Sequence, residues 1–499
     1  MPQRHEAAAR SDSLPESSRT AIPRPASPGS MFVADIDAFV KAEAESLIAE
    51  LSEWCAIPSI STDPSCAADV RRSAEHLAEL METAGMRAEV LAVDRGQPAV
   101  YAEWLGAGAG APTITVYGHH DVQPVDPLDQ WTTPPFEPTV RDGCLYARGA
   151  SDDKGQIHFQ LAAVRHLLAA DGRLPVNLKF FVEGEEEAGS PNIDAFLAEH
   201  ADQLTCDVIF VSDTGMYAAD VPSLVTAMRG MAYFQVDLRT AESDLHSGEF
   251  GGAVPNAIAA LVDLLAGLKD ERGRIAIPGW YDDVIELSDE ERTQFAALPF
   301  DPESFMRTAG VRTLTGEQGW TTLERVWGRP TADVCGIWGG YTGTGSKTVI
   351  PAEAHAKVSF RLVAEQDPAA LRPLFERWAT DNAPEGAEVS AQWLHGVRPC
   401  LTPLDHPGNQ AARRAVARAW GIDPLFTREG GSGPERALSD TLAASCVYLG
   451  VMLPDDHIHA PNERLHLTNY FNGVRAAAYA YEELTRADVA EALLARRSG

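Results

Sequence analysis

Apolar residues recur along the chain at two spacings, and each spacing predicts a different kind of element. From residue 35 onward, two segments with helical spacing precede three short apolar runs typical of buried strands, at 39–54, 70–84, 113–117, 178–182 and 207–211. Between the first two strands, five apolar residues at helical spacing predict a helix with one buried stripe: Ile157, Leu161, Val164, Leu167 and Leu168. Strands that alternate with helices in this way predict an open α/β sheet.

The pattern changes in the middle of the chain. Two segments alternate apolar and polar residues, as in a sheet with one face in water, and a helical stretch follows each; the four lie at 232–238, 256–268, 356–362 and 368–380. The stretch 278–344 is rich in Gly, Pro and Trp and only weakly periodic, so we interpret it as a long excursion of the same unit. After His395 the α/β pattern resumes, with a last apolar strand at 446–453.

These patterns predict two domains and a tail. Residues 31–226 and 397–499 form the α/β domain, and residues 227–396 form an α+β unit inserted into it. Residues 1–30 hold no aromatic side chain and no apolar run, so we expect a disordered tail without a signal peptide.

Composition excludes several classes of partner. The net charge of −31 repels phosphate backbones and anionic lipid, so we expect neither a nucleic-acid nor a membrane partner. No segment approaches the ~20 apolar residues that a membrane span requires. The seven cysteines are scattered and form no Cys-x-x-Cys pair, which argues against a disulfide framework and a thiolate zinc site and predicts a cytoplasmic protein.

Acidic and imidazole-bearing residues gather directly after the predicted strands. The first three strands run into GHHD (118–121), EGEEE (183–187) and SD (212–213). In an open α/β sheet, ligands bind beyond the carboxyl ends of the strands. Four glutamates within five residues repel one another, and a bound dication removes that cost.

Two further clusters complete the set. Asp152 and Asp153 lie in ARGASDDKG (147–155), and His457 and His459 lie in DDHIHAPNE (455–463). Each cluster alone has an ordinary explanation as a helix cap or a solvated polar face. Five clusters in the order His-x-Asp, Asp, Glu-Glu, Asp, His favour instead a hydrolytic Zn²⁺ or Mn²⁺ site, which imidazole and carboxylate ligands suit.

The same residues resemble a known family, the co-catalytic metallopeptidases that include aminoacylase, carboxypeptidase G and the cytosolic non-specific dipeptidases. The resemblance covers nearly everything after the tail and is strongest to the dipeptidase and carnosinase branch; the matching motifs are GHHDVQPV, GCLYARGASDDKG, VEGEEEAGS, SDTG, DLHSGEFGG, SKTVIPAEAHAKVSFRLV, EGGSGP and HAPNE. Together the patterns and the resemblance predict an open mixed-sheet catalytic domain with helices on both faces, and an inserted α+β two-layer lid that forms a dimer.

The resemblance implies two divalent metal ions per subunit, Zn²⁺ in the first place and Mn²⁺ as the alternative. One ion would be held by His119, Asp152 and Asp213, and the other by Asp152, Glu187 and His459, so that Asp152 bridges them. The His-x-Asp spacing selects His119 over its neighbour His120, and the motif selects His459 over His457.

Three other residues near the ligands take roles from the resemblance. Glu186 would be the general base that accepts the proton of a metal-bridged water. Asp121 would orient His119, as carboxylates beside ligating imidazoles do. Asp153 would serve the turn, through an Asp152–Asp153 peptide that is commonly cis in the family.

Substrate contacts are also implied by the resemblance. His246, from the lid of the partner subunit, would stabilise the tetrahedral oxyanion. Arg361 would hold the terminal carboxylate of the substrate through its bidentate fork, together with Gly431 and Ser432 and with help from Thr348.

We therefore predict a homodimeric metallopeptidase that hydrolyses dipeptides or short peptides with a free C-terminal carboxylate. One alternative keeps the mechanism and changes the substrate to an N-acyl amino acid. Another is a metal-binding scaffold without catalysis, against which the intact base Glu186 argues.

Overall fold

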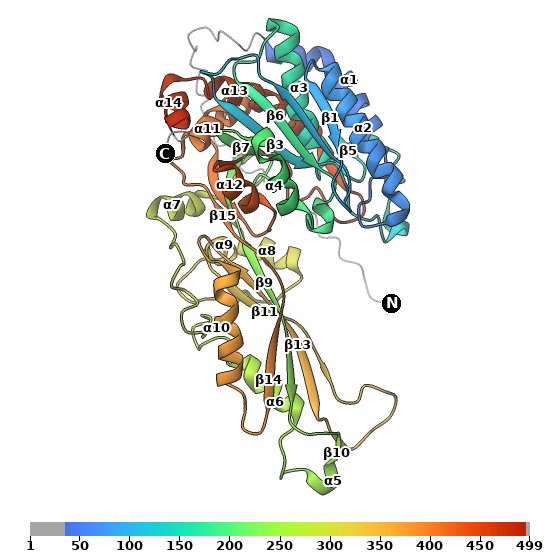
Figure 1. The fold of residues 1–499 in the computed structure, drawn as a ribbon, viewed down its shortest axis with the longest axis vertical. Helices are drawn as coiled ribbons and strands as arrows, with labels where there is room; N and C mark the ends of the chain where they lie inside the picture. The colour runs from blue at the N-terminus through green and yellow to red at the C-terminus, as the bar shows by residue number, and fades with distance from the viewer. Residues whose placement is uncertain (1–34, 496–499) are drawn as a thin grey trace, which may run out of the picture. The chain divides into compact units, whose positions relative to one another are not determined.

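A six-stranded mixed sheet organises the segments that carry the clustered residues. In the computed structural model, which describes residues 35–495, its order is β1-β2-β6-β3-β7-β17 (Figure 1). The strands in that order are β1 (Arg87–Leu91), β2 (Ala99–Trp104), β6 (Asn177–Glu183), β3 (Thr113–His119), β7 (Val208–Val211) and β17 (Ser445–Tyr448). The last four are parallel, and β1 and β2 extend the sheet antiparallel. The predicted tail, residues 1–30, lies outside the described residues.

Helices cover both faces of this sheet, as predicted. The hydrophobic core on one face is formed with α1 (Ile36–Cys55), α2 (Ala67–Thr83), α3 (Lys154–Asp171), α11 (Pro407–Trp420), α13 (Leu467–Glu483) and α14 (Ala487–Ala495). The core on the other face is formed with α4 (Ile193–Leu204) and α12 (Glu435–Leu442). Each face of the sheet is thus closed by its own apolar layer, as a largely parallel sheet requires.

Helix α3 corrects the expectation of one buried stripe. Its first eleven residues, 154–164, are all buried, because α1 and α13 pack on it as well as the sheet. Its polar side chains are buried with hydrogen-bond partners: Lys154 Nζ donates to the carbonyls of Trp54 and Ile57, and Gln160 Nε2 donates to the Ser212 hydroxyl. The polar residues of α3 therefore do not indicate a solvent-exposed face of the helix.

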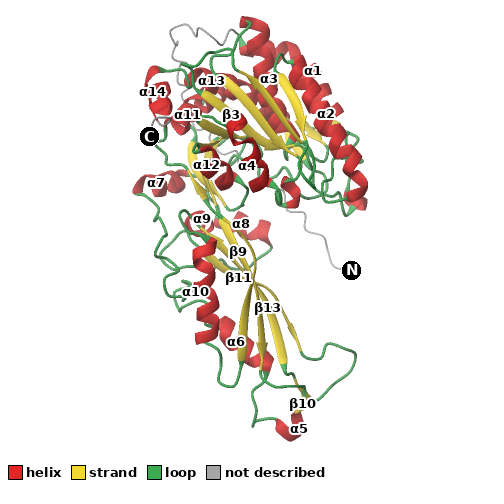
Figure 2. Cartoon of the chain, in the orientation of Figure 1, coloured by secondary structure: helices red, strands yellow, loops and turns green. Residues whose placement is uncertain are grey.

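A second, four-stranded antiparallel sheet lies in the predicted insert (Figure 2). Its order is β11 (Thr331–Gly339), β13 (Glu353–Leu362), β9 (Gly230–Arg239), β14 (Glu388–Val397). The helices α6 (Ala257–Ala266) and α10 (Pro368–Asp381) pack with it in a separate hydrophobic core. The alternation predicted for β9 is observed residue by residue from Gly230 to Leu238, with one face buried in that core.

The stretch 278–344 is more ordered than its weak periodicity suggests. It contains α7 (Asp289–Ala297), α8 (Pro302–Ala309), α9 (Thr322–Gly328) and the strand β11. Capping boxes at Ser288 and Thr321 start α7 and α9. The alternation in β11 is broken by a bulge between Val334 and Gly336, which explains why sequence patterning missed this strand.

Three small sheets connect the remaining segments. The first has the order β18 (Arg464–His466), β5 (Cys144–Tyr146), β4 (Thr139–Arg141), and the second has the order β15 (Cys400–Leu401), β8 (Ser223–Met228), β16 (Leu425–Glu429). The third pairs β10 (Leu245–His246) with β12 (Val349–Ile350). The short helix α5 (Ser247–Phe250) follows β10. The strand predicted at 446–453 is shorter than expected and ends at Tyr448. The β18–β5 pairing brings two motifs distant in sequence, ARGASDDKG and HAPNE, to one place.

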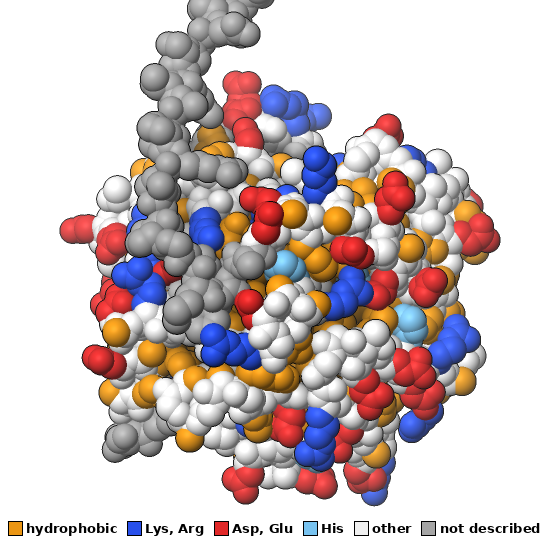
Figure 3. All heavy atoms as spheres, turned by 90° about the horizontal axis from the view of Figure 1, so that it is seen from above, with side chains coloured by type: hydrophobic (Ala, Val, Ile, Leu, Met, Phe, Trp, Pro, Cys, Tyr) orange, Lys and Arg blue, Asp and Glu red, His pale blue; other side chains and the backbone are white. Residues whose placement is uncertain are grey.

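The predicted boundaries after residues 226 and 396 stay a prediction, and buried contacts cross them. Arg428 of β16 donates to the Glu291 carboxylate of α7 through Nε at 2.9 Å. No helix among residues 35–495 is long and apolar enough to cross a bilayer. On the face drawn in Figure 3, the basic side chains of the described residues are interspersed with acidic ones and form no continuous basic area.

Candidate metal centre and its surroundings

The carboxyl ends of three neighbouring parallel strands bring the predicted ligands together. His119 is the last residue of β3, and Asp213 follows β7. Glu186 and Glu187 lie in a single 3-10 turn, Glu186–Ala188, which begins three residues after the end of β6. Because β6, β3 and β7 are adjacent in the sheet, these side chains converge at one edge, where open α/β sheets bind ligands.

Two groups of potential metal ligands share Asp152. In the first, His119 Nε2 lies 3.0 Å from Asp152 Oδ1 and 3.7 Å from Asp213 Oδ2. In the second, His459 Nε2 lies 2.9 Å from Asp152 Oδ2 and 3.3 Å from Glu187 Oε2. Each group brings its ligand atoms within 4.8 Å of one another. The two carboxylate oxygens of Asp152 thus face two different imidazoles, as a bridging ligand requires.

His119, the last residue of β3, and His120, which follows the strand, have different partners. His119 Nδ1 lies 3.0 Å from the Asp121 carbonyl oxygen and 3.4 Å from Asp121 Oδ1. His120 Nε2 instead lies 2.8 Å from the Pro98 carbonyl, and burial lowers the pKa of His120 to about 4. Asp121 Oδ2 also accepts from the backbone N–H of Glu187, so it links both ligand groups.

The position of Asp152 depends on Glu463, which sequence reasoning missed. The buried Glu463 carboxylate accepts from the backbone N–H groups of Gly149, Ser151 and Asp152 at 2.9–3.1 Å. It also accepts from Arg148 Nη1 at 2.7 Å. The Asp152–Asp153 peptide that follows is cis, as the resemblance implied. The available signal was the final Glu of HAPNE, four residues after His459.

The electrostatics of the cluster favour a cation. Burial raises the pKa of Asp213 to about 7, and burial together with neighbouring carboxylates raises the pKa values of Glu186 and Glu187. Although burial acts to raise the pKa of Asp152, the two imidazoles lower it. Carboxylates outnumber imidazoles in this space, so a bound dication would offset the cost of burying them. Nitrogen and oxygen donors in this set fit Zn²⁺ or Mn²⁺.

A group of basic and small residues lies beside the cluster. Arg361 Nη1 donates to the Ser432 hydroxyl at 3.0 Å, and the Gly431 carbonyl accepts from the backbone N–H of Arg229. Burial, with Arg361 nearby, lowers the pKa of Arg229 to about 10. Two guanidinium groups at one turn form a place for an anion. Arg229 carries no sequence signal that distinguishes it from a surface arginine.

His246 and Thr348 lie together, at the other end of the four-stranded sheet. His246 pairs with Val349, and the backbone N–H of Ser247 donates to the Thr348 carbonyl. Both residues are exposed. Arg361 pairs with Met231 near the start of β9, whereas His246 follows the end of this ten-residue strand, which spans ~30 Å. The structure therefore does not bring His246 or Thr348 to Arg361 within one chain.

The sequence is similar to that of known metallodipeptidases. The sequence profile described as peptidase family M20/M25/M40 matches residues 115–483. The chain is 31% identical over 471 residues to a human Beta-Ala-His dipeptidase, covering 90% of this chain and 92% of the relative. It is 30% identical over 456 residues to a Cys-Gly metallodipeptidase of Saccharomyces cerevisiae, covering 86% and 93%.

Solved structures show the same architecture. A metallo-carboxypeptidase of family M20 from Sulfolobus solfataricus superposes with a TM-score of 0.75 at 31% identity, over 89% of this chain and 99% of the other. Human carnosine dipeptidase 1 superposes with a TM-score of 0.71 at 31% identity, over 90% and 98%. The family and fold class predicted from the motifs are confirmed, and the chain belongs to peptidase family M20/M25/M40, a family of metallopeptidases.

Proposed function

We propose that this protein is a dinuclear metallopeptidase that hydrolyses dipeptides or short peptides with a free C-terminal carboxylate. The observation that carries the proposal is the pair of ligand groups that share Asp152, with Glu186 beside them. The family membership and the dipeptidase names of its relatives support it.

Two divalent ions would bind at the two groups. His119, Asp152 and Asp213 would hold one ion, and Asp152, Glu187 and His459 the other, with Zn²⁺ favoured and Mn²⁺ as the alternative. When bound, such ions act as Lewis acids and lower the pKa of a coordinated water. Asp121 would keep the ring of His119 in its ligating orientation through the contact at Nδ1.

Glu186 would act as the general base. It would take the proton of the attacking water and then pass it to the amine that leaves. Glu186 and Ser432 line the same cavity of about 440 Å³, so a substrate held by Ser432 lies within reach of the base. A glutamine at this position would keep the shape of the side chain and lose the proton acceptor.

The turn at residues 431–432 would receive the substrate carboxylate. Arg361, already bonded to Ser432, offers a planar pair of donors, and Gly431 leaves room for close approach. Arg229 adds a second positive charge at the same turn. Thr348 would contribute from the partner subunit, because it lies with His246 in its own chain.

A homodimer formed through the four-stranded sheet would supply His246 to the opposite active site. In the described chain its Nδ1 accepts only from the backbone N–H of Gly248, and the ring is otherwise exposed. Exposed apolar side chains of β11, Val334, Ile337 and Trp338, suit an interface with a second copy. An isologous contact would then complete both sites at once. The seven free cysteines fit a cytoplasmic location.

The decisive experiment is a substrate panel assayed with the metal-reconstituted protein. Dipeptides, β-alanyl-histidine and N-acetyl amino acids would be compared, with and without a chelator, and with Glu186→Gln as the control for contaminating peptidases. Chelator-sensitive cleavage of dipeptides supports the proposal. Cleavage of N-acetyl amino acids alone would establish the deacylase alternative, and no cleavage with two bound ions would leave a binding protein.

A further inference from the structure

A second and larger cavity, of about 800 Å³, lies beside the metal-ligand cluster and has no role in the mechanism above. We call it the α8–α9 cavity, because α8 and α9 form one wall. The other walls come from residues 215–217, 427–430 and 452–458. The first of these segments follows Asp213 and the last directly precedes His459, so the cavity adjoins both ligand groups.

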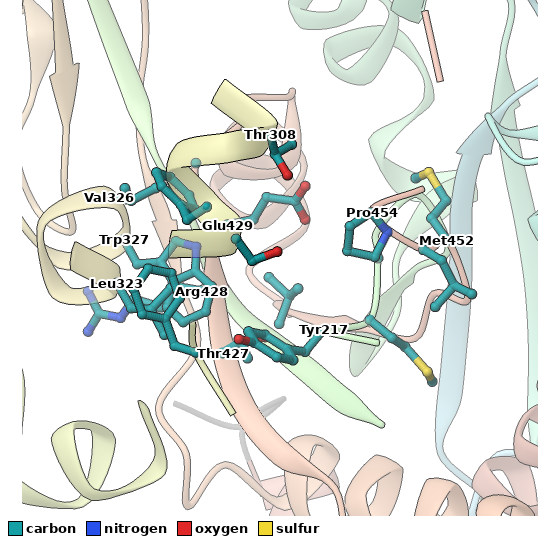
Figure 4. A pocket seen from close by; sticks show the side chains of 18 of the residues that line it. Tyr217, Thr308, Leu323, Val326, Trp327, Thr427, Arg428, Glu429, Met452 and Pro454 are labelled. Atoms are coloured by element: carbon teal, nitrogen blue, oxygen red, sulfur yellow. The ribbon is translucent and has the colours of Figure 1, made fainter. Parts of the chain in front are cut away.

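The walls of the α8–α9 cavity are mainly apolar. Phe300 is one of the large side chains that line it. Figure 4 labels four others: Tyr217, Leu323, Trp327 and Met452. A cavity of this volume lies within the range that accommodates a small organic ligand. Apolar walls favour an apolar or aromatic group as the occupant.

Glu429 is the acidic side chain that can pair with a ligand here. Figure 4 shows it extending into the cavity beside Thr308 of α8. The other acid of the lining, Asp301, uses both carboxylate oxygens to cap α8, accepting from Glu303 and Ser304 N–H groups. The Glu429 carboxylate accepts a hydrogen bond from the backbone N–H of Gly215, and within residues 35–495 no ion pair joins it to a basic side chain. Burial and the nearby Asp152 raise the pKa of Glu429 to about 7. A cationic group on a ligand in the cavity would offset the cost of burying this carboxylate.

The turn that follows Glu429 connects the two cavities. Ser432, three residues later, lines the cavity of Glu186 and is bonded to Arg361. Three residues span at most ~11 Å, and an extended dipeptide spans ~7 Å. The turn thus carries an acid that faces one cavity and a serine, bonded to the Arg361 guanidinium, that faces the other, so groups that could hold the two charged ends of one small substrate lie on either side of it.

We propose that Glu429 binds the free ammonium group of the substrate and that the α8–α9 cavity accepts a large apolar or aromatic side chain on the same residue. The inference rests on the proposed function. It commits the enzyme to dipeptides with a free amine and a bulky first residue, and it gives a physical reason for rejecting N-acyl amino acids, which would leave the carboxylate of Glu429 buried without a cation.

Three substrates separate the two halves of this proposal: Phe-Gly; 3-phenylpropanoyl-glycine, which lacks only the amine; and Gly-Gly, which lacks the side chain. We expect kcat/KM for Phe-Gly to exceed that for each of the other two by about tenfold or more. Glu429→Gln should lower kcat/KM for Phe-Gly and Gly-Gly by about tenfold or more and leave 3-phenylpropanoyl-glycine within about threefold.

The cavity itself is tested with Thr308→Phe, which fills it from an exposed position of α8. This variant should lose activity toward Phe-Gly and retain activity toward Gly-Gly. Glu303 lies on the same helix, is exposed and does not line the cavity, so Glu303→Gln and Glu303→Phe are the matched controls for charge and bulk. Binding of two metal equivalents by each variant verifies that it is folded.

The outcomes are distinguishable from failure of the proposed function. If the wild-type enzyme cleaves Phe-Gly and its desamino analogue equally, or if Glu429→Gln keeps their ratio, the role of Glu429 is overturned while dipeptidase activity stands. Equal loss of Phe-Gly and Gly-Gly cleavage in Thr308→Phe would overturn the role of the cavity. If no dipeptide is cleaved by the wild-type enzyme, the proposed function itself fails.

Discussion

Replacing Glu463 by glutamine tests how the fold holds Asp152 in place. The wild-type carboxylate faces only donors: Arg148 and Gly149 at Oε2, and Ser151 and Asp152 at Oε1. A glutamine has the same shape, but its amide nitrogen is a donor and must face one of these two pairs. Two buried hydrogen bonds are therefore lost whichever way the amide is turned.

The expected loss of stability follows from the buried donors that are left without an acceptor. Each buried donor without a partner costs about 1–3 kcal/mol. Turning the amide oxygen toward Arg148 keeps that bond but removes the countercharge of a guanidinium that is about 1% exposed, and breaking a buried ion pair costs about 3–5 kcal/mol. We expect the free energy of unfolding to fall by about 3–5 kcal/mol, and metal affinity to fall about 10–100-fold because Asp152 is no longer oriented.

Denaturant unfolding of the chelated protein gives the first quantity, and calorimetric metal titration gives the second. Glu199→Gln, an exposed position of α4, is the matched control and should change neither. If Glu463→Gln unfolds within about 1 kcal/mol of the wild type and binds metal within about threefold, the hydrogen bonds around Glu463 do not position Asp152, and the reasoning is wrong.

Four further changes test the site. Glu186→Gln should keep two metal equivalents and lose turnover; loss of metal would make Glu186 a ligand. Asp152→Ala should bind less metal than Asp213→Ala or His459→Ala, because it serves both groups, and full occupancy by elemental analysis would contradict bridging. Metal affinity should fall as the pH drops below about 7, because Asp213, whose pKa burial raises to about 7, must lose its proton to ligate; a titration that is flat from pH 6 to 8 would contradict this. His246→Ala should lower kcat by about 10²-fold with both ions bound, and mixing it with Glu186→Gln should restore partial activity by subunit exchange; a monomer, or no recovery after exchange, would refute the contribution in trans.

Sequence patterning located the site because the strands that carry it are buried. The runs in β3, β6 and β7 are apolar, and acidic or imidazole-bearing residues lie at or just beyond their ends. These residues could therefore be assigned to one edge of a sheet. The His-x-Asp spacing favoured His119 over His120, but the sequence could not show what the other imidazole contacts. The structure separates them by their partners, Asp152 for one and the Pro98 carbonyl for the other.

Three residues have roles that come only from tertiary contacts, and the sequence did not assign these roles. Glu463 and Glu429 lie within the motifs HAPNE and EGGSGP, but nothing in these motifs separates their roles from those of their neighbours, and Arg229 lies in no motif. Their surroundings in the fold give each a distinct role. Glu463 accepts four hydrogen bonds that hold the turn before Asp152, Arg229 places a second guanidinium near Arg361, and Glu429 places an acid in an apolar cavity. Burying a charge is costly unless it is paired, so a buried charge without an ionic partner suggests that a ligand of opposite charge binds there.

The proposed binding of both charged ends of the substrate also implies a limit on substrate length. The chain as a whole carries a net charge of −31. At the site, two guanidinium groups, Arg229 and Arg361, lie at the turn that follows the carboxylate of Glu429. If both ends of the substrate are held there, each added residue lengthens an extended peptide by ~3.5 Å and moves one charged end away from its partner. The cost of leaving Glu429 or the arginine pair without a counterion would then rise with peptide length, so the proposed contacts would favour dipeptides over longer peptides.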